Sequence, residues 1–298
     1  MKNLIINMRK IQIQKFFPPW ILFAGLIITA VFYSAGCASR RSETTPVSSF
    51  AAIGKDADVY VFLPVKGNEP LLSALFTAFV PEKTAAQYIS RTSVLYAGFR
   101  YGTHSSLSLI SDGSYPAGLA GLVFSKKNGW KKYRSSDAGK TVYYRSESAD
   151  AALLSNRTAA VLAGAHPRNI EALLQRFKTP EQPVFSPRFT SFIETGADKI
   201  GVYLRSAKAV AAELFGLKDI ELPLTSIELY LEKQQDSYRY SAVFETHNAR
   251  TALVLRLLLG NVLKGSISVD GAAVFLENAD ITEEHLAELL AAAMGIPS

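Results

Sequence analysis

Apolar residues recur along the chain at two spacings, one typical of strands and the other typical of helices. A strand near the start of the folded part is indicated by two alternating sets of β-branched, aromatic and aliphatic residues: Val59, Val61 and Leu63, and Tyr60 and Phe62. Runs of this kind that are separated by a short polar break, as at residues 234–236, predict antiparallel hairpins. Together with helical stretches between the strands, they favour an α+β fold.

Two parts of the chain repeat the same pattern. Residues 158–174 resemble residues 271–290, and residues 56–65 resemble residues 197–206. The order that they share is strand, helix, strand, strand, helix, strand, strand, helix, with extra strand material in the first copy around Trp130 to Ser148.

We therefore predict two pseudo-repeated modules of antiparallel sheet packed with amphipathic helices. The first module covers residues 53–180 and the second covers residues 188–298, and a stretch that contains prolines joins them.

A helix with one apolar stripe is predicted after residue 70, and Pro81 breaks or kinks it. The stripe consists of Leu71, Leu72, Leu75, Phe76, Phe79 and Val80. Such a stripe must be buried against something, and Leu72, Phe76 and Phe79 are candidates for contact with a membrane or an apolar ligand.

The predicted helix at residues 249–264 is apolar around nearly all of its circumference, interrupted only by Arg256 and Asn261. Helices of this kind are normally buried in a core, between two sheets or at the module interface. The alternative is that part of the surface, including Leu257 and Leu258, lines a cavity or meets a bilayer.

Five basic and two aromatic residues surround an Asn-Gly turn at residues 126–134. Trp130 and Tyr133 suit the headgroup zone of a membrane, and lysines are attracted to anionic lipid. The alternative is an ordinary solvated turn, because Asn-Gly is itself a strong hairpin signal.

The N-terminus has the three regions of an export signal: a basic start, an apolar run of 14 residues from Trp20 to Tyr33, and small residues that lead to Cys37. The apolar run is short for a membrane span, which needs about 20 residues. Cys37 is the only cysteine, so no intramolecular disulfide can form. We predict a cleaved signal peptide at residues 1–36 and a flexible tether at residues 37–52.

The sequence Ser34-Ala35-Gly36-Cys37 resembles a lipobox, the motif at which bacterial lipoproteins are cleaved and acylated on the new N-terminal cysteine. The usual motif prefers Leu at the position of Ser34, and relaxed motifs of this sort resemble those of spirochaetes. The resemblance implies that Cys37 carries the acyl chains, palmitate among them, that anchor the protein to membrane lipids.

The formal charge of +6 is concentrated in the signal segment, which holds four of the 32 basic residues and none of the 26 acidic ones. The remaining 28 basic and 26 acidic residues give only +2, so we expect no nucleic-acid partner.

No motif for catalysis is present. The four histidines are scattered, none in a metal-ligand spacing, and neither a nucleophile elbow nor a nucleotide-binding glycine loop occurs. We therefore expect no enzyme activity, no catalytic residue, no metal and no cofactor.

In its lipobox, its duplicated α+β modules and its amphipathic helices, the chain resembles the concealed outer-membrane lipoproteins of treponemes. That resemblance implies a place in the cell envelope, lipid-anchored at the periplasmic face of the outer membrane, and a role in altering membrane permeability. Two other functions stay open: a periplasmic carrier of a lipid or apolar small molecule, and an interaction module for another envelope protein.

Overall fold

The computed structural model describes residues 46–77, 82–100, 106–116, 124–136, 141–147, 149–164, 169–195, 198–205 and 224–293. The helices in this part of the chain are α2 (Pro46–Ile53), α3 (Glu69–Thr77), α4 (Glu82–Ile89), α6 (Ile170–Arg176), α7 (Pro187–Thr195), α9 (Ala249–Val262) and α10 (Glu283–Ala293), with a 3₁₀ turn η1 (Lys126–Asn128). The strands are β1 (Val59–Pro64), β2 (Thr92–Arg100), β3 (Ser106–Gly113), β4 (Lys131–Arg134), β5 (Val142–Arg145), β6 (Ala149–Leu153), β7 (Thr158–Gly164), β8 (Ile200–Leu204), β9 (Leu224–Gln234), β10 (Ser237–Thr246), β11 (Ser266–Asp270) and β12 (Ala273–Thr282).

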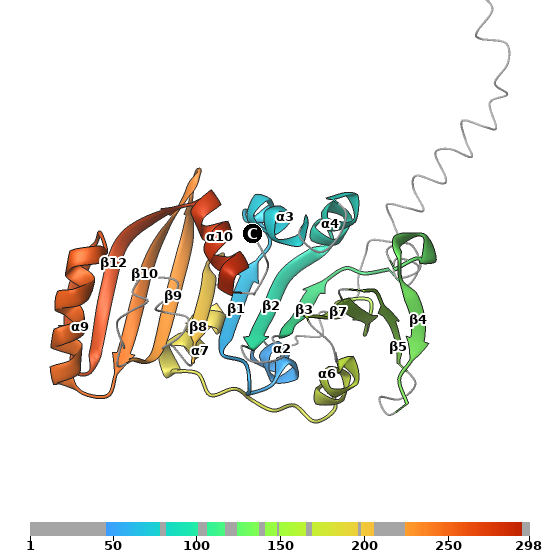
Figure 1. Cartoon of the computed structure of the whole chain (residues 1–298), viewed down its shortest axis with the longest axis horizontal. Helices are drawn as coiled ribbons and strands as arrows, with labels where there is room; N and C mark the ends of the chain where they lie inside the picture. The colour runs from blue at the N-terminus through green and yellow to red at the C-terminus, as the bar shows by residue number, and fades with distance from the viewer. Residues whose placement is uncertain are drawn as a thin grey trace, which may run out of the picture. The chain divides into compact units, whose positions relative to one another are not determined.

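The twelve described strands form one antiparallel sheet in the order β11-β12-β10-β9-β8-β1-β2-β3-β7-β6-β5-β4. Figure 1 shows β12 near one end of the sheet and β4 at the other. The predicted α+β class with antiparallel pairing is confirmed. The hairpin predicted around residues 234–236 joins β9 to β10, and the extra strand material after Trp130 forms β4 and β5.

Strands follow the same order outward from the central pair of β1 and β8. On one side they run β1, β2, β3, β7, β6, and on the other side β8, β9, β10, β12, β11. The register of the central pair agrees with this symmetry, since Val59 lies opposite Leu204 and Phe62 lies opposite Gly201. This order is the one expected of two equivalent modules; the module boundaries that we predict stay a prediction.

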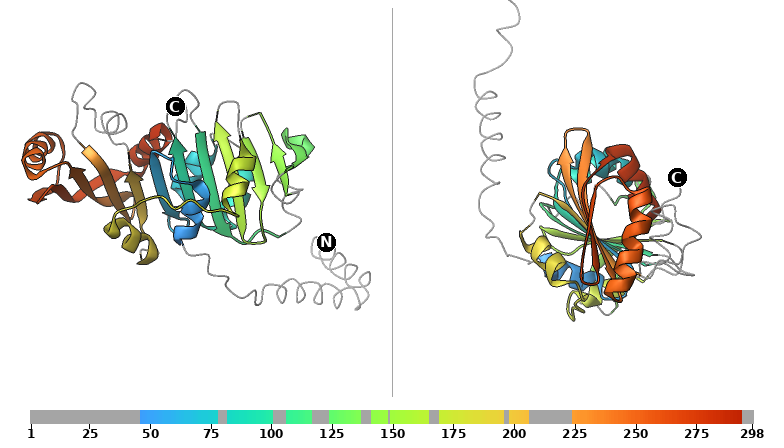
Figure 2. Two further views of the ribbon diagram at one scale, coloured as in Figure 1. Left: turned by 90° about the horizontal axis from the view of Figure 1, so that it is seen from below. Right: turned by 90° about the vertical axis from the view of Figure 1, so that its left-hand side faces the viewer.

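Each face of the sheet carries its own core. On one face, Val59, Val61 and Leu63 of β1 pack in the larger core with residues of α3, α4, α9 and α10. On the other face, Tyr60 and Phe62 pack with residues of α2 and α7. Figure 2 shows α9 on one side of the sheet and α2 and α7 on the other.

The stripe predicted after residue 70 lies on α3, where Leu71, Leu72 and Leu75 are buried in the larger core. Phe79 and Pro81 lie outside the described residues. The predicted signal peptide, Cys37 and most of the tether also lie outside them, whereas α2, which begins at Pro46, is helical where we expected a flexible tether.

Candidate membrane-contact surface

Helix α9 lies at one end of the sheet, against β10, β11 and β12. The side chain of Asn248 caps its first turn by accepting a hydrogen bond from the backbone N–H of Thr251 at 3.0 Å. The inner face of the helix, with Ala252, Leu255 and Leu259, is buried in the larger core. The end of the helix and its inner face are therefore accounted for by ordinary capping and packing.

The outer face of α9 is apolar as well, although no described residue covers it. Leu257 is 69% exposed, and Leu253 and Val254 are each 53% exposed. Leu253 and Leu257 are four residues apart and hence neighbours on the helix surface. A contiguous exposed apolar patch is typical of a surface that contacts a membrane or a partner.

Positive charge flanks this patch. Arg250 and Arg256 are exposed on α9, Lys264 follows the helix, and α9 contains no acidic residue. Arginine and lysine can hold an apolar stem against lipid while their charged ends reach the headgroups. Apolar and cationic side chains on one exposed helix are the combination found in helices that lie in a membrane interface.

The predicted contact residues fall in different places. Leu257 is exposed, whereas Leu258 is half-buried against the larger core. Leu72 is buried, and Phe76 is half-buried, with its ring centroid 5.1 Å from that of Tyr88. Contact of these candidate residues with a membrane or ligand stays a prediction, and for Leu72 it requires the side chain to leave the core.

Trp130 is only 8% exposed and lies in the larger core, where its ring packs on Phe124 with centroids 4.8 Å apart. In this arrangement the ring cannot reach a headgroup zone. Leu253 and Val254 were not among the contact residues predicted from the sequence. The signal that could have identified them is the continuous apolar circumference of this helix, which leaves apolar residues outside whichever face is buried.

A charged cluster with a buried carboxylate lies on the other face of the sheet. The carboxylate of Glu228 is fully buried; its Oε2 accepts a hydrogen bond from Tyr230 and lies 3.7 Å from Nη1 of Arg188. Glu228 Oε1 has no hydrogen-bond partner in this part of the chain. Burial, and then the bond to Glu228, raise the pKa of Tyr230, so its hydroxyl stays protonated and acts as a donor.

This cluster links α7 to the sheet. Arg188 lies between Glu228 of β9 and Glu245 of β10, at 3.7 and 3.8 Å, and its guanidinium lies over the ring of Phe275. In the described residues, no group of three or more histidine, cysteine or acidic side chains could hold a metal ion.

None of the described helices is long and apolar enough to cross a membrane. With its 14 residues, α9 is about 21 Å long. Its length and its one exposed apolar face suit a helix that lies along a lipid surface.

An α+β domain with an exposed apolar and cationic helix suits a protein that associates with a membrane. The chain belongs to the family described as outer membrane-associated lipoprotein TP0453, whose model matches residues 44–287. It is accordingly a lipoprotein of the cell envelope, associated with the outer membrane.

Solved and curated relatives agree with this assignment. The chain is 26% identical to outer membrane protein TP0453 of Treponema pallidum (strain Nichols), over 91% of this chain and 92% of that protein. Crystal form I of TP0453 is similar with a TM-score of 0.74 and 26% identity, over 87% of this chain and 100% of that one. Crystal form III gives a TM-score of 0.72 and 26% identity, over 85% and 100%.

Proposed function

We propose that this protein is a non-catalytic lipoprotein that acyl groups on Cys37 anchor at the periplasmic face of the outer membrane. Helix α9 then enters the lipid leaflet with its outer face and alters the permeability of the membrane. The observation that carries this proposal is the exposed apolar patch of Leu253, Val254 and Leu257 beside Arg250 and Arg256.

The energies involved favour two attachments acting together. Full burial of one large aliphatic side chain contributes about 1.5–3 kcal/mol, so each half-exposed side chain of the patch gains on the order of 1 kcal/mol on entering lipid. Three such side chains give weak, reversible binding. A single acyl chain is also only marginal, so acyl groups and α9 together hold the domain more firmly than either does alone.

The proposal is tested on the non-acylated chain, by which we mean residues 37–298 with Cys37→Ser. We expect this chain to cosediment with lipid vesicles in high salt, because burial of apolar surface is not screened by ions. The double variant Leu253→Asp, Leu257→Asp should lose this binding and should release less dye from loaded vesicles than the parent chain.

A matched control is Val184→Asp, which places the same charge on another apolar side chain, 84% exposed and far along the chain from α9. This variant should bind vesicles as the parent does, and circular dichroism should show that all three chains are folded. Equal vesicle binding by the parent and the α9 variant would contradict a role for α9. If neither binds but lipid copurifies with the chain, the carrier function is favoured instead.

A further inference from the structure

Positive charge is concentrated at the end of the sheet opposite to α9. Strand β4 is the last strand in the sheet order, and all four of its residues are exposed (Figure 1). With the preceding turn it carries five cations: Lys126, Lys127, Lys131, Lys132 and Arg134. No acidic residue occurs between residues 124 and 136. We call these five residues the basic end.

A rigid base holds the basic end in place. Gly129 adopts a left-handed conformation with φ of 79°, which closes the turn and returns the chain to Trp130. The ring of Trp130 packs on Phe124, and the ring of Phe124 stacks on Tyr144 of β5 with centroids 5.2 Å apart. The lysines therefore project from a packed hairpin in which Trp130 is buried, while Tyr133 of β4 is 38% exposed with Arg145 over its ring.

The buried carboxylate on β6, two strands from β4, binds a cation outside the basic end. Asp150 of β6 is fully buried and accepts two hydrogen bonds of 2.8 Å from Arg145. The guanidinium of Arg145 in turn lies over the rings of Tyr133 and Tyr143. Within the described residues, none of the five cations of the basic end has an acidic side chain within 4.0 Å.

Protection of a sheet edge explains only part of this pattern. Lysines on an edge strand prevent pairing with the edge of another sheet, and Lys131 and Lys132 serve that purpose. Lys126 and Lys127 lie in η1, outside the strand, where they protect no edge. The charge of Lys126 and Lys127 adds to a cationic rim. Alternate residues of β4 point to opposite faces of the sheet, so Lys131 and Lys132 extend this rim over both faces.

We propose that the basic end is a second attachment site, which binds an anionic lipid surface by charge alone. A rim of long lysine side chains suits lipid headgroups, because the headgroups can move to meet them. Each cation near an anionic bilayer strengthens binding about fivefold. This site is separate from α9, because the two lie at opposite ends of the sheet. Its binding should fall with salt, whereas insertion of α9 should persist.

The test uses the non-acylated chain that also carries Leu253→Asp and Leu257→Asp, so that the basic end is measured without α9. We expect this chain to bind vesicles of phosphatidylglycerol and phosphatidylcholine at about 0.01 M salt and to dissociate at about 1 M, where the Debye length falls from about 30 to about 3 Å. Vesicles of phosphatidylcholine alone should not bind. Adding Lys126→Glu and Lys132→Glu should weaken binding about 30-fold or more.

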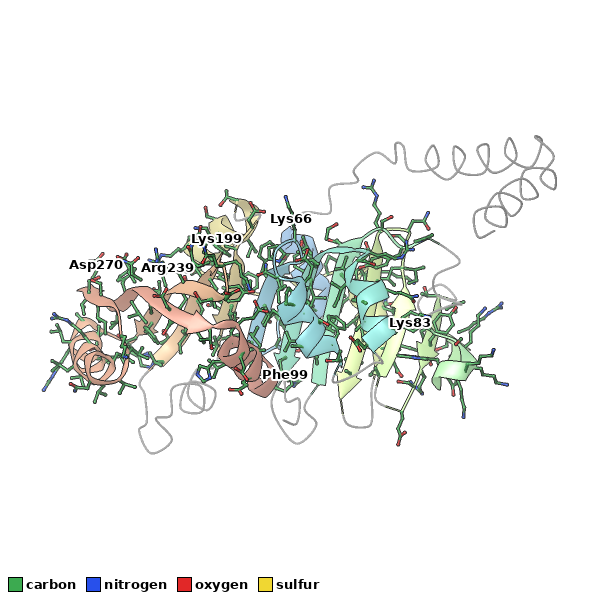
Figure 3. The ribbon with its side chains drawn as sticks, turned by 90° about the horizontal axis from the view of Figure 1, so that it is seen from above. Lys66, Lys83, Phe99, Lys199, Arg239 and Asp270 are labelled. Carbon is green, nitrogen blue, oxygen red and sulfur yellow. The ribbon has the colours of Figure 1, made fainter. Side chains whose placement is uncertain are left out.

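The control is Lys66→Glu with Lys83→Glu, which changes the net charge by the same amount. Both lysines are exposed, one after β1 and one on α4, over the middle of the sheet (Figure 3). Binding should be largely kept in this control. The proposal is wrong if both pairs of substitutions weaken binding equally, or if the chain with Leu253→Asp and Leu257→Asp binds phosphatidylcholine as well as it binds the anionic mixture. Either outcome leaves the test of α9 unaffected.

Discussion

Gly98 of β2 allows α2 to lie directly on the sheet. A Cβ atom at this position would be 2.2 Å from Cγ2 of Ile53 and 3.3 Å from Cβ of Ala57. Ile53 is β-branched and buried, so its side chain has little freedom to move away. The contact is therefore a place where a single methyl group decides whether α2 can pack.

We expect Gly98→Ala to lower the free energy of unfolding by about 1–3 kcal/mol, since overpacking forces backbone shifts. Chemical denaturation of the non-acylated chain measures the change. Gly260→Ala on α9 is the control, because a Cβ there meets nothing within 4 Å. Alanine should raise stability there by up to about 1 kcal/mol through helix propensity. A Gly98→Ala chain as stable as the parent would mean that α2 does not pack as described.

The surroundings of a single side chain were the hardest feature to predict from the sequence. Trp130 was a candidate for a membrane headgroup zone because of the charges beside it, with a solvated turn as the alternative, yet its ring lies in the core. Its partners are Phe124, outside the basic segment, and through it Tyr144 of the next strand. A local window shows charge and turn type, but it does not show which distant side chains fill the space beside a ring.

At the scale of elements, the order of the strands along the chain could be predicted because they have a clear period, but helix α2 and the face that a helix covers could not. Helices α6 and α10 follow equivalent strands in the two halves, yet α10 packs on the face of the larger core and α6 on the other face. Strand β7 is apolar on both faces, with Ala159 and Ala163 on one and Ala160 and Leu162 on the other. In β12 the second face carries Glu277 and Asp280, so a helix can bury apolar surface on one face only.

Helix α7 depends on the ion cluster beneath it. We expect Arg188→Met to lower the free energy of unfolding by about 1–2 kcal/mol, because it leaves the buried carboxylate of Glu228 without its cation. The half-exposed position of Arg188 keeps the loss below that of a fully buried pair. Adding Glu228→Gln to the Arg188→Met chain should recover part of the lost free energy of unfolding. Urea unfolding of the single and the double variant measures both changes.

The comparison for this prediction is Lys199→Met. Lys199 Nζ lies 2.8 Å from Glu232 Oε2, closer than Arg188 is to Glu228, but both partners are about half exposed (Figure 3). Water screens this pair, so its loss should change stability by less than about 1 kcal/mol. If Lys199→Met costs more than Arg188→Met, then distance rather than burial decides the strength of these pairs.

On the scale of the whole molecule, the two candidate attachment surfaces lie at the two ends of one sheet. Twelve strands give eleven spacings, so the ends are about 50 Å apart before twist is considered. This separation is several times the Debye length at physiological salt, about 8 Å, so each end acts independently. Neither the distance between the two surfaces nor the order of the strands in the sheet was evident from the sequence, because each surface was predicted only as a local segment. The two surfaces lie far apart because β1 and β8 join the two halves into one sheet.

A molecule with an independent contact at each end should join two membranes. We expect the non-acylated chain to cluster vesicles that contain phosphatidylglycerol at low salt, seen as a rise in particle size by dynamic light scattering. Substituting either end alone, with Leu253→Asp and Leu257→Asp or with Lys126→Glu and Lys132→Glu, should abolish clustering while leaving the vesicle binding of the other end intact. High salt should disperse the clusters yet leave chain bound through α9, because only the basic end is screened. Clustering that survives substitution of one end would show that both contacts are not needed, and dimerisation of the chain would then have to supply the second attachment.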